Sequence, residues 1–195
     1  MAHFAPLGLT APDTNPVLAT RTDYCANAPH TVAGTFLNAR DMELKYLISD
    51  NHAPGKTPTE GLTARASGPQ NVLWCGIGTR TYILVSIADM VSPEESMAGT
   101  LERILDGASA AVYDHIVAVG DGTILGGKFQ WPPGELSMSQ LLFLKVWNAN
   151  NHQLTWGVLH SSIAAIASFM NTHGWGVGHF DIYDGGIRVG YGIFT

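Results

Sequence analysis

The sequence predicts an α+β domain in which helices pack on one side of an antiparallel sheet. Three observations lead to this fold class. Two β-rich runs open the folded part of the chain, two later stretches repeat apolar residues at helical spacing, and the C-terminal residues alternate around an Asp184-Gly185 turn signal. Strand pairs that alternate with amphipathic helices must bury both apolar surfaces against each other.

Composition limits the domain count and the kind of surface. A chain of 195 residues is long enough for one domain with its own core. Hydrophobic residues make up 46% of the chain, which excludes global disorder. Charged residues make up only 13%, against roughly 25% in typical soluble domains. The sparse charge favours a homo-oligomer, and an extracellular life or a large apolar-lined binding site are the alternatives.

Charge and cysteine content restrict the partners and the compartment. A net charge of −6 with ten Lys and Arg residues argues against a nucleic-acid partner. No apolar run approaches the roughly 18–20 residues of a membrane span, and the N-terminus lacks the features of a signal peptide. Cys25 and Cys75 would be free thiols in the cytosol or one disulfide in a secreted chain. We expect a cytoplasmic protein, with a secreted mature form as the alternative.

The chain divides into an irregular N-terminal arm, residues 1–35, and a single α+β domain, residues 36–195. Within that domain, residues 41–48 are compatible with a short helix or a strand. Residues 50–70 contain three Pro and three Gly and are predicted to form a long loop. The β-rich runs on either side of Gly76 then predict a hairpin.

The first helical stretch begins with a capping signal. Ser92 is followed by a proline and, three residues after the serine, by a glutamate, which is typical of a helix start. Gly107 either ends this helix or weakens it. Residues 115–119 are apolar enough to predict a strand, which turns at Gly122. The Trp-Pro-Pro-Gly segment at 131–134 ends that element.

The second helical stretch follows a short apolar strand at 141–147. Residues 150–153 resemble a capping box, and Leu159 begins an apolar stripe at helical spacing. Gly174 is the expected C-terminal cap of this helix.

The last hairpin permits a prediction of register. With Asp184-Gly185 as a two-residue turn, Asp181 lies opposite Arg188 and His179 lies opposite Gly190. One face of the pair then collects the apolar side chains of Phe180, Ile182, Ile187 and Val189.

The two helical stretches and the strands after them suggest an internal repeat. His115 and His179 differ by 64 positions, and the same offset relates Gly122 to Gly186. The sequence therefore predicts two pseudo-equivalent helix-plus-hairpin units, with the two histidines at corresponding strand starts.

The candidate catalytic residues are His179 and His115, with Asp181 and Asp114 as their orienting partners. Two imidazoles brought to one hollow could act as general acid and base. In the competing interpretation, Asp181 pairs with Arg188 and His179 is an ordinary surface residue.

The candidate substrate-binding residues are Trp175, Gly190, Tyr183 and His160. Trp175 stands between glycines, which indicates a displayed aromatic wall, and a strand glycine such as Gly190 leaves room for a ligand. The spacing of the His and Cys residues predicts no metal site, and no dinucleotide or phosphate motif predicts a cofactor. Cys75 is more typical of a buried residue than of a nucleophile.

Together these features predict a small cofactor-independent enzyme of isomerase, cyclase or lyase type. It would use histidine acid/base chemistry on a largely apolar, uncharged small molecule. The alternative is a non-catalytic protein that self-assembles or is secreted as an interaction partner.

Overall fold

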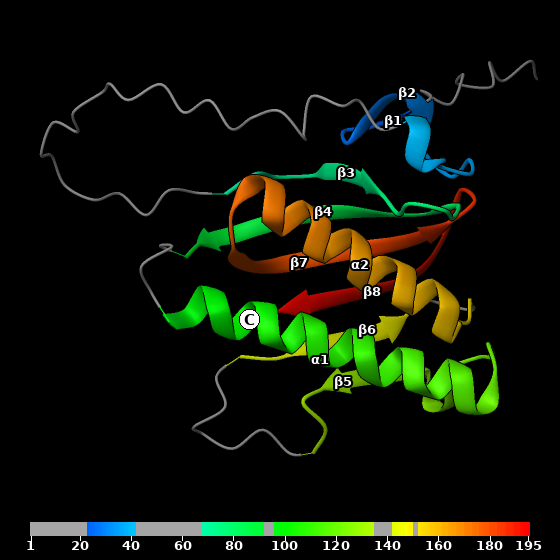
Figure 1. The fold of residues 1–195 in the computed structure, drawn as a ribbon, viewed down its shortest axis with the longest axis vertical. Coiled ribbons are helices and arrows are strands. Elements are labelled where there is room, and N and C mark those ends of the chain that lie inside the picture. The colour runs from blue at the N-terminus through cyan, green and yellow to red at the C-terminus, as the bar shows by residue number, and fades with distance from the viewer. Residues whose placement is uncertain (1–22, 42–67, 92–95, 135–141, 150–151) are drawn as a thin grey trace, which may run out of the picture.

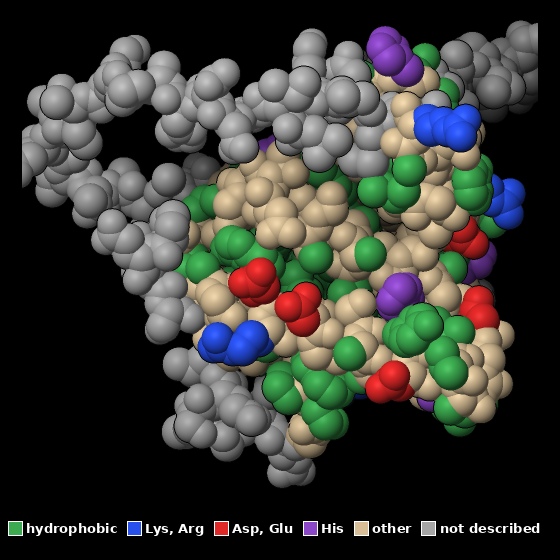
Figure 2. All heavy atoms as spheres, in the orientation of Figure 1, with side chains coloured by type: hydrophobic (Ala, Val, Ile, Leu, Met, Phe, Trp, Pro, Cys, Tyr) green, Lys and Arg blue, Asp and Glu red, His purple; other side chains and the backbone are tan. Residues whose placement is uncertain are grey.

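The computed structural model describes residues 23–41, 68–91, 96–134, 142–149 and 152–195. Two helices lie across one face of a six-stranded antiparallel sheet, and a small N-terminal hairpin lies beside the first strand of that sheet (Figure 1). The predicted α+β class, with helices on one side of an antiparallel sheet, is confirmed. The helix-covered face in Figure 2 carries only scattered charged side chains among apolar and uncharged atoms.

The sheet has the strand order β3-β4-β7-β8-β6-β5, and every neighbouring pair is antiparallel. The bounds in that order are β3 Val72–Cys75, β4 Thr81–Met90, β7 Gly176–Asp184, β8 Ile187–Phe194, β6 Leu144–Asn148 and β5 Lys128–Trp131. The predicted hairpin around Gly76 is the β3–β4 pair, and the predicted strand at 141–147 corresponds to β6. Strand alternation sends every second side chain toward the helices.

The core fills the space between the sheet and the helices α1 (Ser96–Val119) and α2 (Trp156–His173). Its members come from both layers, because each helix buries one apolar stripe against the alternating apolar side chains of the strands. The largest fully buried side chains of this core include Trp74, Phe169, Phe180 and Phe194.

Helix α1 is longer than the sequence suggested. The prediction that residues 115–119 form a strand is wrong, since the helix runs through Gly107 and ends at Val119. Its buried stripe, Leu101, Ile104, Leu105, Ala108 and Val112, keeps helical spacing past the glycine. Burial of that stripe outweighs the modest helix propensity of the β-branched residues at its end. The expected helix start at Ser92 lies outside the described residues.

Helix α2 begins later than expected. Its N-cap is Thr155, whose hydroxyl accepts a hydrogen bond from the Val158 N–H at 3.3 Å. The predicted capping box at 150–153 therefore does not cap this helix, because Gln153 precedes the cap. The predicted C-terminal cap is confirmed, since Gly174 has a positive φ of 95° and its N–H donates to the Met170 carbonyl.

The N-terminal arm is not irregular throughout. Residues β1 Tyr24–Cys25 and β2 Ala28–Val32 pair as a short hairpin, followed by a 3-10 turn η1 at Ala39–Asp41. A disulfide joins Cys25 of this hairpin to Cys75 of β3. The interpretations of Cys75 as a nucleophile or a free buried thiol are therefore wrong.

The same hairpin covers part of the exposed edge of β3. The Asn27 side chain is fully buried; its amide nitrogen donates to the Cys75 carbonyl at 2.9 Å and its oxygen accepts from the Cys75 N–H at 3.0 Å. The Ala26 N–H also donates to the Leu73 carbonyl. These bonds satisfy backbone groups that an edge strand would otherwise leave open to pairing.

The predicted pseudo-equivalence of two units is not confirmed. His115 lies within helix α1, whereas His179 lies within strand β7. The segments related by the offset of 64 positions therefore differ in secondary structure. Shared glycine and histidine positions alone do not define a structural repeat.

The register of the last hairpin also differs from the prediction. The turn residues are Gly185 and Gly186, so that Asp184 pairs with Ile187, and a bulge follows between Ile182 and Tyr183. As a consequence His179 lies opposite Ile193, and Ile182 lies opposite Gly190. The Gly-Gly dipeptide takes the turn because both of its residues adopt a positive φ.

The remaining predictions fall mainly outside the described residues. Of the segment 41–48 only Asp41, the end of η1, is described, and of the loop 50–70 only residues 68–70.

Candidate functional site

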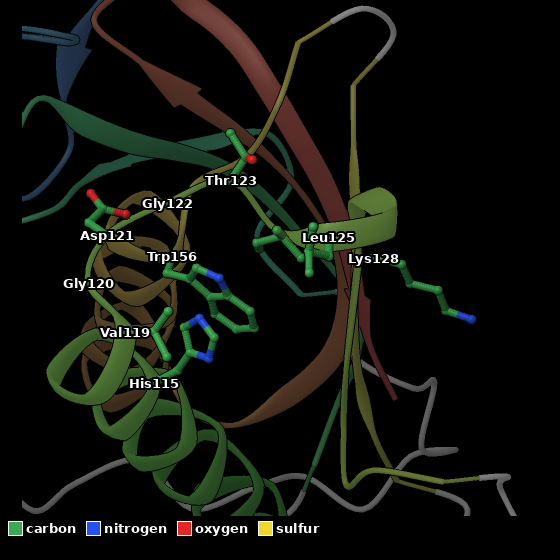
Figure 3. Close-up of a pocket in the computed structure, with 10 residues that line it drawn as sticks. His115, Val119, Gly120, Asp121, Gly122, Thr123, Leu125, Lys128 and Trp156 are labelled. Carbon is green, nitrogen blue, oxygen red and sulfur yellow. The ribbon is translucent and has the colours of Figure 1, made fainter.

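The end of α1 and the start of α2 enclose a hollow of ≈ 270 Å³ (Figure 3). Residues 119–125, which connect α1 to the 3-10 turn η3 (Leu125–Gly127), form its floor and mouth. The side chains that matter for its chemistry are those of His115, Trp156, Thr123, Val119 and Leu125.

Backbone pairing holds this hollow in place. The N–H of Ile124 donates to the Leu154 carbonyl at 3.0 Å, and the Trp156 N–H donates to the Gly122 carbonyl at 3.0 Å. The Asp121 carboxylate accepts from the Gly157 N–H at 2.8 Å, in the first turn of α2. A carboxylate at this position satisfies one of the free N–H groups of the helix start and interacts favourably with the helix dipole. The Asp121 oxygen that makes this bond is therefore committed to structure.

Two aromatic rings line the hollow from the helices. The imidazole of His115 lies against the indole of Trp156, with ring centroids 4.0 Å apart and planes inclined by 30°. Phe129 of β5 packs edge-on against Trp156, with ring centroids 6.0 Å apart. Within the described part of the chain, neither nitrogen of the His115 ring makes a hydrogen bond. The imidazole is therefore positioned by packing, and its polar atoms stay available.

Apolar side chains form the opposite wall and the rim. Leu125 lies across the hollow from the two rings, while the Lys128 side chain points away from them (Figure 3). The exposed fractions of Leu125 and Val119 are 92% and 75%, which is high for apolar side chains. Their exposure leaves free energy to be gained when a ligand removes them from water.

The structure separates the two predicted catalytic histidines. His179 is exposed on the face of the sheet opposite the helices, because its neighbour Phe180 belongs to the core between the sheet and the helices. His115 belongs to the helix layer on the other side of the sheet. The two imidazoles therefore do not meet at one hollow within a single chain.

The orienting carboxylates are also placed elsewhere. Asp181 forms an ion pair with Arg188, whose Nε lies 3.0 Å from Oδ1 of the carboxylate. This pairing matches the competing interpretation, in which His179 is a surface residue. Asp114 is exposed on α1 next to His115 and has no hydrogen bond to the described residues.

The predicted substrate-binding residues do not converge either. Trp175 packs against the core and its carbonyl accepts from the Val91 N–H, so it is not a displayed loop residue. Gly190 is buried opposite Ile182, and Tyr183 stacks on Tyr82 with ring centroids 4.7 Å apart. His160 lies on α2 beside Tyr113, with ring centroids 6.0 Å apart.

Sequence reasoning missed the residues that complete the hollow, above all Trp156 and Leu125. The signal for Trp156 was its place directly after Thr155, a residue type that caps helices, which would have placed the indole at a helix start. Nothing in the local sequence links Leu125 to His115, because their proximity depends on how α1 ends.

The described residues also bear on metal binding and membrane insertion. In these residues, no group of three or more His, Cys, Asp or Glu side chains could hold a metal ion. None of the helices there is both long and apolar enough to cross a membrane.

Comparisons with known proteins supply no relative. No protein-family model, no curated protein and no solved structure matches this chain. The function must therefore be inferred from the geometry and chemistry of its surfaces.

Proposed function

We propose that the hollow beside His115 binds a small, largely apolar, uncharged molecule, and that His115 exchanges a proton with that molecule. The observation that carries the proposal is an imidazole without a hydrogen-bond partner among the described residues, held against Trp156 at an apolar-walled hollow. Such sites combine apolar walls for affinity with one polar group for orientation.

The walls are suited to an uncharged ligand. Val119 and Leu125 are exposed at the mouth, and full burial of one such side chain contributes about 1.5–3 kcal/mol. The nearest carboxylate, Asp121, is engaged by the Gly157 N–H, and the Lys128 amine points away. The hollow therefore presents no charged side chain aimed at a ligand.

A single imidazole is sufficient for an isomerisation. Neutral His115 would remove a proton from the carbon next to a carbonyl group and return it to another position, so that no net proton is consumed. General acid–base catalysis of this kind contributes about 10²–10⁴-fold to a rate. This version of the enzyme hypothesis requires neither His179 nor Asp181.

The test uses cyclohexanone, a small apolar ketone, in deuterated water. Exchange of its α-protons, followed by NMR, measures proton transfer without knowledge of the natural substrate. We expect the protein to accelerate exchange, His115→Gln to abolish the acceleration, and His179→Gln to preserve it. Chemical-shift changes at the Trp156 indole would report binding separately. Equal exchange with His115→Gln and the unaltered protein would contradict the catalytic role.

The second candidate function is a non-catalytic protein of an oxidising compartment, and the disulfide supports it. Cys25 and Cys75 are joined across 50 positions, and structural disulfides persist mainly outside the reducing cytosol. We propose this compartment in place of the cytoplasm. Mass spectrometry of the protein from its native source, with thiols blocked at lysis, should show no free cysteine; two blocked thiols would support the cytoplasm instead.

Self-association is the other form of this second function. Four apolar side chains with large exposed fractions lie near the C-terminal end of α1 and the following turn: Tyr113 (56%), Val117 (69%), Val119 (75%) and Leu125 (92%). Exposed apolar surface of this kind is typical of interaction sites. Light scattering should give a homo-oligomer that Val117→Ser weakens, whereas a monomer at high concentration would contradict the proposal.

A further inference from the structure

The face of the sheet opposite the helices carries a row of planar side chains. We call it the planar row and define it as Trp147 of β6, Tyr191 and Arg188 of β8, and Asp181 of β7. Phe180 and Ile182, on either side of Asp181, and Val146, before Trp147, belong to the core, so strand alternation places Asp181 and Trp147 on the open face. Tyr191 and Arg188 lie opposite Asp181 and Tyr183 in the β7–β8 register and share that face. The row crosses three adjacent strands, a width of about 10 Å.

Contacts within the planar row hold its groups rigidly. The rings of Trp147 and Tyr191 are stacked, with centroids 5.5 Å apart and planes inclined by 19°. The Arg188 guanidinium carbon lies 5.4 Å from the Tyr191 ring centroid, and the same guanidinium is bound to Asp181. Because β6 and β7 flank β8 on opposite sides, Tyr191 lies between Trp147 and the Arg188–Asp181 pair. Side chains that are already ordered lose little entropy when they bind a ligand.

The planar row keeps several hydrogen-bonding atoms unused. Both bonds from Arg188 go to Oδ1 of Asp181, so that Oδ2 accepts no bond from the described residues. Nη1 of Arg188, the Trp147 indole N–H and the Tyr191 hydroxyl likewise have no partner in that part of the chain. The row thus offers both donors and acceptors side by side, at the edges of rings that are themselves apolar.

This combination selects among ligand classes. Single-stranded nucleic acids bind by stacking bases on open aromatic faces, but here the faces of Tyr191 are turned toward Trp147 and Arg188. A dry protein interface would bury the Arg188–Asp181 ion pair, and the desolvation of two charges offsets much of their attraction. Sugar hydroxyls both donate and accept hydrogen bonds, which matches the unused donors and acceptors of the planar row.

We propose that the planar row binds a carbohydrate chain of a few sugar units laid across β6, β8 and β7. The free Oδ2 of Asp181 accepts from sugar hydroxyls, while Arg188 and the indole of Trp147 donate to them. Lys145 lies on the same face, directly opposite Ile193 and two residues before Trp147 in β6. A positive charge at this place favours a chain that contains acidic sugars over a neutral chain.

The test measures binding of two hexasaccharides, a galacturonic acid oligomer and a glucose oligomer, by titration calorimetry. We expect binding of at least one, with the acidic oligomer bound more tightly at low salt. Tyr191 is 39% exposed, offers its hydroxyl and holds Trp147 and Arg188 in place, so Tyr191→Ala should weaken binding at least tenfold. Asp181→Asn should also weaken it, because the amide nitrogen cannot accept a hydrogen bond. Glu102→Gln, at an exposed position of α1 on the other side of the sheet, is the control and should bind normally.

Three outcomes would overturn the proposal. The first is that neither hexasaccharide binds at millimolar concentration, and the second is binding that Tyr191→Ala leaves unchanged. The third is that single-stranded DNA binds the same face more tightly and displaces the sugar. Thermal unfolding of each variant separates lost binding from lost folding. Trp147→Phe, which keeps an aromatic ring but removes the indole donor, provides a second variant if Tyr191→Ala unfolds. These outcomes are independent of the hollow beside His115, because that site uses none of the same residues.

Discussion

Two glycines in helix α1, Gly99 and Gly107, provide a matched test of the packing that places this helix on the sheet. Alanine is preferred over glycine inside a helix by about 1 kcal/mol, so that either Gly→Ala change would stabilise an isolated helix. In the folded protein the two positions differ in their surroundings. A Cβ at Gly99 would have its nearest neighbour, the Arg103 Nη1, at 3.8 Å.

At Gly107 the same Cβ would meet a tryptophan. It would lie 2.6 Å from Nε1 and 3.0 Å from Cε2 of Trp131, well inside ordinary contact distance. Trp131 itself packs against the core, so its ring has little freedom to move aside. Overpacking of this kind costs about 1–3 kcal/mol. Since the gain in helix propensity is the same at both positions, it cancels in the comparison, and Gly107→Ala should be less stable than Gly99→Ala by about 1–3 kcal/mol.

Urea unfolding followed by far-UV circular dichroism measures this difference, provided that the two variants share one m-value. The Trp131 indole N–H resonance should shift in Gly107→Ala and stay in place in Gly99→Ala. Equal stability of the two variants, together with an unchanged indole resonance, would refute the close approach of α1 to β5. Such a result would also call into question the position of the C-terminal end of α1, which carries His115.

Three further predictions concern the N-terminal hairpin and the open face. Replacing both cysteines of the Cys25–Cys75 bridge by serine should lower the free energy of unfolding by about 4 kcal/mol, as the chain-entropy model gives for a loop of 50 residues. Wild-type protein in reductant should be as stable as the variant. A loss below about 1 kcal/mol would contradict the model. Asn27→Ala should cost about 2 kcal/mol, because it leaves the Cys75 backbone groups without their buried partner; an unchanged urea midpoint would show that water replaces the amide at no cost. Burial, together with the neighbouring Tyr183 phenol and a nearby carboxylate, raises the pKa of Tyr82 above its ordinary value of 10.0. The stability that the raised pKa of Tyr82 contributes is therefore complete below about pH 10 and is lost as the pH rises through the folded-state pKa. Tyr82→Phe should therefore reduce the fall in Tm at alkaline pH. An identical fall in the variant would exclude Tyr82 ionisation as its cause.

Patterns local in sequence predicted much of the architecture correctly. Alternating apolar residues found strands β3, β4, β6, β7 and β8, and apolar spacing found both helices. The errors lie where two local patterns compete. Residues 115–119 have strand-like composition, but they extend a helical stripe whose burial was invisible in sequence. The turn forms at Gly185-Gly186 instead of Asp184-Gly185, because both positions of the turn require a positive φ, which glycine adopts most easily.

The candidate site was less accessible to prediction than the fold. His115 lines a hollow, but its expected partner His179 lies on the other face of the sheet. Its actual neighbour, Trp156, is 41 positions away and reaches it only because α1 and α2 pack side by side. The partner of His179 likewise changed by three positions, from Gly190 to Ile193, because moving the turn by one residue changes the partner by two and the bulge adds one.

By itself, the order of apolar and polar residues determined the fold class, the number of helices among the described residues and the strands that carry the core. These properties follow from periodicity, which each segment expresses without reference to the rest of the chain. Only the tertiary structure decided the pairing of Cys25 with Cys75, the register of the last hairpin, the hollow at His115 and the planar row on the open face. The disulfide, the hollow and the planar row depend on contacts between distant segments, so their geometry is set by how helices and strands pack. The hairpin register depends on two competing adjacent turn signals and on a bulge.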